Sequence, residues 1–412
     1  MEGIVFKIKR KKLGVSLDYI SSCVDITKGE LSRFENNKRK LNDDLISQLF
    51  FKLDRTIGLD VKSEKDLIHC VKKLYKCIIN KQDLNICFED YVYSVWKNAR
   101  NEYYLVWLVG LLLFSSFLNL SSQDYELNEL MNILNDNEIY IPLSVKSIYF
   151  SILGHYYEFS DIHKSLECFQ SAKSSASNLI EEAYALYEIG KHKCYFNDLT
   201  EALDCLVSAN TIFSNQFCFN ASIAVQTELG FVYSKIGLYD KATKILNGCI
   251  ELLKITPGIV GDIKKISSYL LFTLLDKKAY DEIIQRKEEI LLIDNEKPLF
   301  LFCIGYAYYH KNDLVNAKKY IISAWRKRNP QFKQEHELIQ AYKLILNGKS
   351  FEDYEKKFLN ALNEKKDIHG IHGIQFQVFV LEELIYFSKK EGKTERILEY
   401  YEKLHNKLRK RN

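Results

Sequence analysis

The chain has 412 residues, of which 47% are hydrophobic and 27% charged, so it can bury a core and wholesale disorder is excluded. Its 4 prolines and 17 glycines are too few for a sandwich or barrel of strands, which needs many turns, so we expect an all-α protein. The net charge is +4, but residues 1–40 hold ten basic and five acidic side chains, and this local excess suggests a nucleic-acid contact there.

The first fifty-five residues predict four short helices with recognisable ends. Apolar spacing indicates a helix over residues 4–13, with Phe6 and Leu13 on one face, and Gly14 ends it. Polar residues suited to helix termini mark the others: Ser16 before Leu17–Cys23, Thr27 with Glu30 as a capping box, Asn36–Asn37 at the end of the third helix, and Asn42 before a fourth helix reaching Leu53. A three-residue turn between the second and third helices is helix-turn-helix geometry.

Residues 16–20 (SLDYI) and 26–38 (ITKGELSRFENNK) resemble the phage-repressor class of helix-turn-helix domains. The resemblance covers about residues 3–55 and implies a structural ion pair between Arg10 and Glu35. One departure affects binding, because Leu17 stands where the family has a glutamine that holds a phosphate. The resemblance implies two sets of DNA contacts: Thr27, Lys28, Gly29 and Arg33 at base edges in the major groove, and Ser16, Lys38, Arg39 and Lys40 at phosphates.

An uncharged segment follows from Tyr103 to Gln123, and its length would allow a membrane span. Serines and an asparagine make its second half polar, so we interpret it as a buried helix of a larger array. The ten cysteines include no Cys-x-x-Cys pair, and we expect small buried side chains in a reducing cytosol. The N-terminus lacks a signal-peptide apolar core. We therefore expect a cytoplasmic protein without a membrane segment.

From residue 150 onward a pattern recurs around Gly154, Gly190, Gly230 and Gly305. After three of these glycines the same residue classes return at +3, +12, +16 and +19, and after Gly154 one residue is missing between the helices. Small residues fit where two antiparallel helices approach closely, and large ones fill the remaining space. The pattern resembles the tetratricopeptide repeat. We count eight or nine helix pairs in all, and the resemblance implies a right-handed superhelix with a concave binding groove.

Positions −3, +1 and +4 from each repeat glycine are expected to face this groove, which in tetratricopeptide proteins typically takes an extended peptide. The set mixes aromatic and hydroxyl side chains with few charges, which suits a short apolar peptide. Packing between repeats is an equally good explanation for each aromatic residue alone. The candidate peptide-binding residues are Ser151, His155, Tyr187, Lys191, Thr227, Phe231, Ser234, Phe302, Tyr306 and Tyr309.

The sequence carries no motif for phosphate-loop, dinucleotide, zinc-protease or calcium sites. The pair His369 and His372 is flanked by glycines with no further ligand nearby, so we interpret it as a loop and not a metal site. No serine or cysteine stands in a nucleophile setting. We therefore expect neither an enzyme nor a cofactor.

A helix-turn-helix domain (residues 1–56) joined to a tetratricopeptide-like array (57–412) is similar to the peptide-responsive quorum-sensing regulators of Gram-positive bacteria, the PlcR, NprR and Rgg types. That resemblance implies double-stranded DNA and a short signalling peptide as partners. It also implies a homodimer, because two half-sites multiply the affinity of a small reading domain. Peptide binding would then rearrange the DNA-binding domains, provided that the peptide prefers one arrangement.

Two alternatives remain open. In the first, the repeats capture a partner protein, as in the related response-regulator phosphatases, and DNA binding is secondary. In the second, the chain is a phage-type repressor whose repeats only dimerise it. The absence of an evident Asn or Arg clasp for a peptide backbone favours the second alternative.

Overall fold

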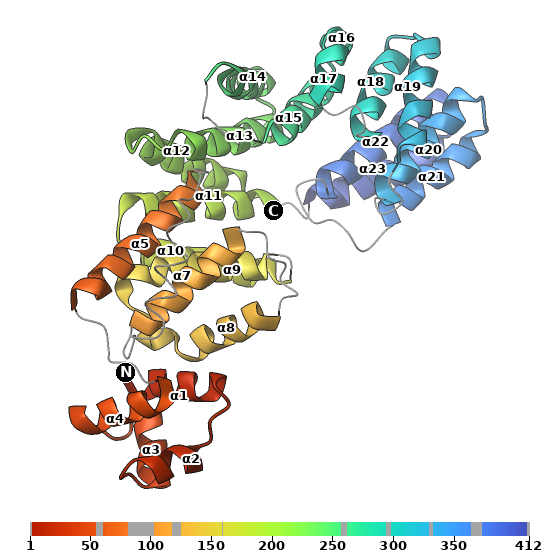
Figure 1. Ribbon diagram of the computed structural model, residues 1–412. Helices are drawn as coiled ribbons and strands as arrows, with labels where there is room; N and C mark the ends of the chain where they lie inside the picture. The colour runs from red at the N-terminus through yellow and green to blue at the C-terminus, as the bar shows by residue number, and fades with distance from the viewer. Residues whose placement is uncertain are drawn as a thin grey trace. The chain divides into compact units, whose positions relative to one another are not determined.

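The computed structural model describes residues 2–54, 61–80, 103–117, 125–158, 160–256, 262–293, 298–328, 333–363 and 373–409. Within these ranges the chain forms α-helices, one 3-10 helix and no strand, so the predicted all-α class is confirmed (Figure 1). The predicted boundary between residues 56 and 57 lies outside the described residues and stays a prediction.

The first four helices agree with the predicted ones to within a few residues. They are α1 (Glu2–Lys12), α2 (Leu17–Cys23), α3 (Lys28–Glu35) and α4 (Asp43–Asp54). Leu13 was expected to share a face with Phe6, but it lies beyond the end of α1 and is exposed. Ile4 and Ile8 are buried together with Phe6, so α1 is enclosed on two sides and its pattern is broader than a single stripe.

Gly3 lets α1 approach α3 closely. A Cβ atom at this position would lie 1.9 Å from the carbonyl oxygen of Phe34. Phe6 packs edge-on against Phe50 of α4, with ring centroids 5.5 Å apart, and fills the centre of this small core.

The helices of the remaining chain follow in order. They are α5 (Val61–Ile79), α7 (Tyr103–Phe117), α8 (Tyr125–Asp136), η1 (Glu138–Tyr140), α9 (Leu143–Tyr157), α10 (Ile162–Ser174), α11 (Leu179–Tyr195), α12 (Leu199–Asn215), α13 (Phe219–Lys235), α14 (Tyr239–Ile255), α15 (Ile263–Asp276), α16 (Tyr280–Gln285), α17 (Lys287–Ile293), α18 (Pro298–His310), α19 (Leu314–Arg326), α20 (Lys333–Leu346), α21 (Phe351–Asn363), α22 (Gly373–Lys390) and α23 (Thr394–Arg409).

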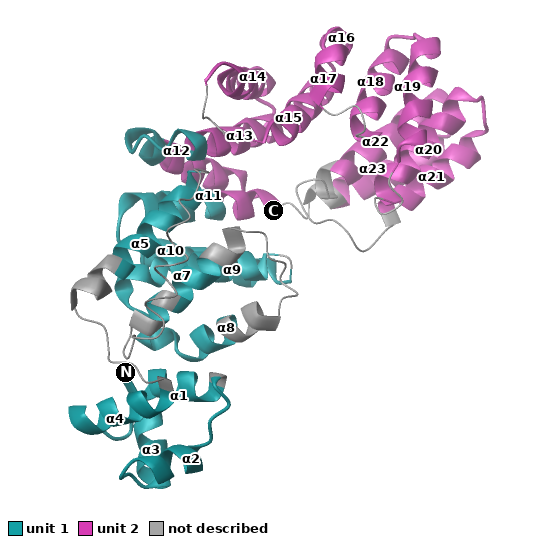
Figure 2. Cartoon of the chain, in the orientation of Figure 1, with its two compact units in different colours: residues 1–189, 211–221 teal, residues 190–210, 222–412 magenta. Residues whose placement is uncertain are grey.

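The chain divides into two compact units (Figure 2). Unit 1 comprises residues 1–189 and 211–221, and unit 2 comprises 190–210 and 222–412. Sequential helix pairs dominate the packing within each unit, with α9 against α10 in unit 1 and α18 against α19 and α20 against α21 in unit 2. In unit 2, the segment that follows α15 is broken at Arg286 into the two short helices α16 and α17.

The repeat glycines lie where the sequence pattern predicts close approach. A Cβ on Gly190 would lie 2.7 Å from Leu206, and one on Gly230 would lie 2.7 Å from Leu246. Each partner is the large residue sixteen positions later. Gly154 meets Phe169 instead, fifteen positions later, in agreement with its shorter turn. The glycine-to-large-residue contact therefore sets the spacing of these helix pairs.

Helix α7 forms most of the uncharged segment whose length would allow a membrane span. Its residues Leu105, Val106, Leu108 and Val109 are fully buried within the protein, as expected for a core helix. Over the described parts of the chain, no helix combines the length and the hydropathy that a bilayer crossing requires.

Candidate functional site

The turn between α2 and α3 is fixed by side chains at the helix ends. The Ser16 hydroxyl accepts a hydrogen bond from the Tyr19 backbone amide at 3.1 Å. Thr27 Oγ1 accepts one from the Glu30 amide, while a Glu30 carboxylate oxygen accepts from the Thr27 amide at 3.1 Å. These hydrogen bonds from Thr27 lower the pKa of Glu30. The predicted capping box is thus present, and it fixes where α3 begins.

The ion pair implied by the family resemblance is also present. Arg10 donates from Nε to Glu35 Oε1 at 2.5 Å and from Nη2 to Oε2 at 2.9 Å. Its Nη1 donates to the Val15 carbonyl at 2.6 Å, beside the start of α2. Both charged groups are buried, so the pair cannot reach DNA. It connects α1 to the end of α3 and to the segment that leads into α2.

All eight residues predicted to contact DNA are exposed. Two of those on α3 make contacts of their own: Lys28 pairs with Asp18 at 2.8 Å, and Arg33 Nε donates to the Gly29 carbonyl at 3.2 Å. Arg33 therefore lies along the outer face of α3, within reach of a ligand on that face. Gly29 and Arg33 lie one turn apart on α3 and are in contact through this hydrogen bond.

The basic turn after α3 differs in its partners. Arg39 Nη1 pairs with Glu30 Oε1 at 2.6 Å, whereas Lys38 and Lys40 have no ion-pair partner in the described part of the chain. A phosphate would compete with Glu30 for Arg39 but with no carboxylate for the two lysines. Arg39 is thus the least available of the three cations.

The predicted groove positions divide into buried and accessible residues. Partly accessible are His155, Tyr187 and Lys191. The other seven are buried: Ser151, Thr227, Phe231, Ser234, Phe302, Tyr306 and Tyr309. Seven of the ten predicted groove residues are therefore covered by other parts of the protein.

In unit 1 the cover comes from α5. The Tyr75 hydroxyl donates to Ser151 Oγ at 2.8 Å, and the Tyr75 ring packs edge-on against Tyr184, 5.6 Å between centroids. Next to them His155 Nε2 lies 2.7 Å from the Tyr184 hydroxyl and Nδ1 lies 3.2 Å from Glu158. Burial raises the pKa of Tyr184. Sequence patterns gave no signal for Tyr75, since its partners lie more than seventy residues away.

In unit 2 the cover over α18 comes from α20 and α22. Tyr306 donates a hydrogen bond to Glu383 Oε1 at 2.8 Å, and Tyr342 donates to Oε2 of the same carboxylate. Burial raises the pKa of Glu383 to about 7, against the two phenol hydrogen bonds, which lower it. His310 stacks on Tyr280 at 4.9 Å, and burial lowers its pKa to about 4.

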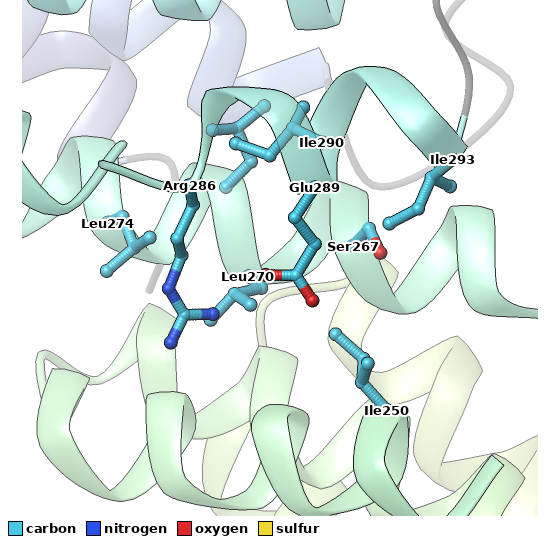
Figure 3. Close-up of a pocket in the computed structure, with 9 residues that line it drawn as sticks. Ile250, Ser267, Leu270, Leu274, Arg286, Glu289, Ile290 and Ile293 are labelled. Carbon is cyan, nitrogen blue, oxygen red and sulfur yellow. The ribbon is translucent and has the colours of Figure 1, made fainter. Parts of the chain in front are cut away.

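A small pocket in unit 2 lies between α14, α15 and α17, with Arg286 at its edge (Figure 3). Most of its lining is aliphatic, and its two charged residues point to partners outside it. Arg286 donates to Asn247 Oδ1 at 2.8 Å, and Glu289 pairs with Lys254 at 2.6 Å. None of the predicted peptide-binding residues lines this pocket, which is a gap in a helix seam.

No group of three or more His, Cys, Asp or Glu side chains suited to a metal ion occurs among the described residues. The pair His369 and His372 lies outside them.

The architecture is that of an all-α, tetratricopeptide-like helical-repeat protein with the four short helices α1 to α4 at its N-terminus. Solved structures share this superhelical repeat fold, which confirms the predicted fold class. A Rap protein in complex with the competence and sporulation factor matches with a TM-score of 0.62 and 12% identity, covering 84% of this chain and 99% of the Rap chain.

The apo form of the quorum sensor NprR from B. thuringiensis matches with a TM-score of 0.63 and 15% identity, over 84% of this chain and 99% of NprR. Aspartyl phosphate phosphatase F from Bacillus subtilis matches with a TM-score of 0.56 and 11% identity, over 85% and 95% of the two chains. At these identities the likeness concerns the fold. No protein-family model and no curated protein matches the sequence.

Proposed function

We propose that the chain is a DNA-binding transcriptional regulator whose activity is controlled by a short signalling peptide bound to the repeat domain. One observation carries the first half of this proposal. The capped α2–turn–α3 unit exposes all eight candidate DNA contacts, while its buried Arg10–Glu35 pair holds the three helices together. The local excess of basic residues supports an anionic partner at this end of the chain.

The repeat fold supports the second half. Similar folds belong to a Rap protein that binds the competence and sporulation factor and to the quorum sensor NprR. A cytoplasmic homodimer that reads two half-sites fits this function. The peptide acts by binding one arrangement of the dimer more tightly than the other, since a ligand without such a preference shifts no equilibrium.

A second function has specific support, because aspartyl phosphate phosphatase F shares the repeat fold. In that case the repeats bind a partner protein. Calorimetry separates the two functions: synthetic peptides from secreted pro-peptides encoded beside the gene bind a sensor directly, whereas a scaffold binds response-regulator proteins and none of the peptides.

The DNA-binding proposal is tested on a site selected from a random duplex pool. Arg33→Ala is expected to cost about 1–3 kcal/mol at one base pair and to relax sequence preference there, because a bidentate contact to guanine is lost. Lys38→Ala is expected to weaken binding to all sequences alike. Gel shifts over a panel of single-base variants measure both effects.

Arg326→Ala in α19 removes another exposed arginine, one that lies in the repeats, and serves as the control. If Arg33→Ala reduces the affinity for every duplex sequence by the same factor, the base-reading role is contradicted. Failure of the full chain to bind any duplex at low salt would contradict the proposal itself.

A further inference from the structure

Helix α5 contacts the repeats at the positions where a groove ligand is expected. Tyr75 occupies the space over Ser151 of α9 and Tyr184 of α11 through the hydrogen bond and ring contact given above. Tyr75 and Ser151 are both buried, and Ser151 in turn donates to the Ser147 carbonyl at 3.0 Å. An external ligand could reach the Ser151 hydroxyl only if Tyr75 moved away.

The C-terminal end of α5 caps the start of α13. Asn80 Oδ1 accepts hydrogen bonds from the backbone amides of Asn220 and Ala221 at 3.2 and 3.4 Å. The Asn220 side chain donates to the Asn80 carbonyl at 2.7 Å. Cys218, which precedes α13, offers no side-chain oxygen, so Asn80 supplies from a distance of 140 positions the cap that the local sequence lacks.

A third anchor lies one turn before Tyr75. Lys72 Nζ donates to Ser177 Oγ at 2.8 Å, just before α11 begins. Lys72 and Tyr75 of α5, together with Asn80 directly after its end, thus contact the repeats at α9, just before α11 and at the start of α13, and we call these three the anchor residues. An extended ligand of a tetratricopeptide groove would likewise contact consecutive repeats.

Apolar side chains of α5 lie beside Tyr75. Leu67, Val71 and Leu74 are buried, and the largest helix contact of α5 is with α7. The apolar side chains therefore join α5 to its neighbour in the chain, and the anchor residues bind the repeat face through hydrogen bonds.

We propose that α5, through its anchor residues, is an intramolecular ligand of the repeat face formed by α9, the start of α11 and the start of α13, and that any peptide ligand must displace it from there. The proposal rests on the proposed function for the identity of that peptide. Because α5 is part of the same chain, its effective concentration at the face is high, and an external ligand competes against it. Helix α5 also begins seven positions after α4 ends, so the segment displaced is the one that follows the DNA-binding domain in the chain.

The test uses the full chain and a fluorescein-labelled synthetic peptide of residues 67–80 as probe. Tyr75→Phe removes only the hydroxyl that binds Ser151, and Asn80→Ala removes the cap of α13. Each lost hydrogen bond is expected to raise hydrogen exchange of the α5 amides by about fivefold. The double variant is expected to bind the probe at least about tenfold more tightly than the unaltered chain, whose own α5 fills the site.

Lys73→Ala is the matched control, because Lys73 lies on α5 but is exposed. Unchanged exchange in α18 and α19 shows that the variants remain folded. Equal probe binding by all chains, no binding by any of them, or exchange in α5 that stays as slow as in α9 overturns the proposal. None of these measurements involves DNA or a signalling peptide, so their failure leaves the proposed function untouched, and failure of the gel shifts leaves this proposal untouched.

Discussion

Among single residues, the buried carboxylate of Glu383 has an unusual environment. Glu383 lies between two phenol groups, Tyr306 and Tyr342, and no cation pairs with it among the described contacts. Desolvation outweighs the two hydrogen bonds, so the neutral acid is favoured in the folded protein up to a pKa of about 7. Repulsion from Glu382 adds to the shift, and Lys278 opposes it.

In the unaltered protein we expect the free energy of unfolding to fall as pH rises, and Glu383→Gln is expected to remove this fall. The folded pKa lies above the unfolded one, so the unfolded state alone gains charge between about pH 4.5 and 7, and the free energy of unfolding falls over that window. Relative to the unaltered protein, the glutamine variant should gain up to about 3 kcal/mol between pH 4.5 and pH 8. Urea unfolding at several pH values measures the difference.

Glu395→Gln is the control, because this carboxylate on α23 is exposed. A difference between Glu383→Gln and the unaltered chain that does not change with pH would show that the buried carboxylate keeps an ordinary pKa.

In the helix pair formed by α13 and α14, two glycines have different surroundings. Gly230 on α13 lies against Leu246, where an added Cβ would come within 2.7 Å of the side chain. Gly248 on α14 has no heavy atom within 4 Å of the equivalent position. Both glycines are helical, so the difference between them isolates packing from helix propensity.

Gly230→Ala is therefore expected to destabilise unit 2 by about 1–3 kcal/mol through overpacking of the α13–α14 contact. Gly248→Ala should stabilise it by up to about 1 kcal/mol, because alanine is the better helix former and nothing obstructs it. Thermal unfolding of the two variants decides. If both shift in the same direction, the repeat glycine is not kept for close approach.

The sequence pattern was sufficient for these local features and insufficient for the covering helices. Caps such as Thr27–Glu30 and the contact of Gly230 with Leu246 involve residues close in the chain, so spacing reveals them. The cover over Ser151 comes from Tyr75, and that over Tyr306 comes from Glu383, in both cases more than seventy positions away. Periodicity identifies the buried face of a helix but not the segment that packs on it. The sequence therefore predicts the groove positions but not the helices that cover them.

For the whole molecule, where the charge lies matters more than its total. The chain carries +4 overall, yet the excess is concentrated in residues 1–40, which hold ten of the 58 basic side chains and only five of the 54 acidic ones. Because Arg39 already pairs with Glu30, we expect Lys38 and Lys40 to be the cations of the basic turn that release counterions if a phosphate binds there.

The double change Lys38→Ala with Lys40→Ala should reduce the slope of log affinity against log salt by about 2, since each phosphate contact contributes about 0.9. Lys244→Ala with Lys318→Ala removes the same charge from exposed positions on α14 and α19, so the net charge of the two variants is equal. The two double variants are compared by measuring their affinity for duplex DNA at salt concentrations between about 50 and 200 mM. If both pairs reduce the slope alike, DNA responds to the net charge of the chain and the N-terminal domain has no special role; a change confined to the first pair places the phosphate contacts on the turn after α3.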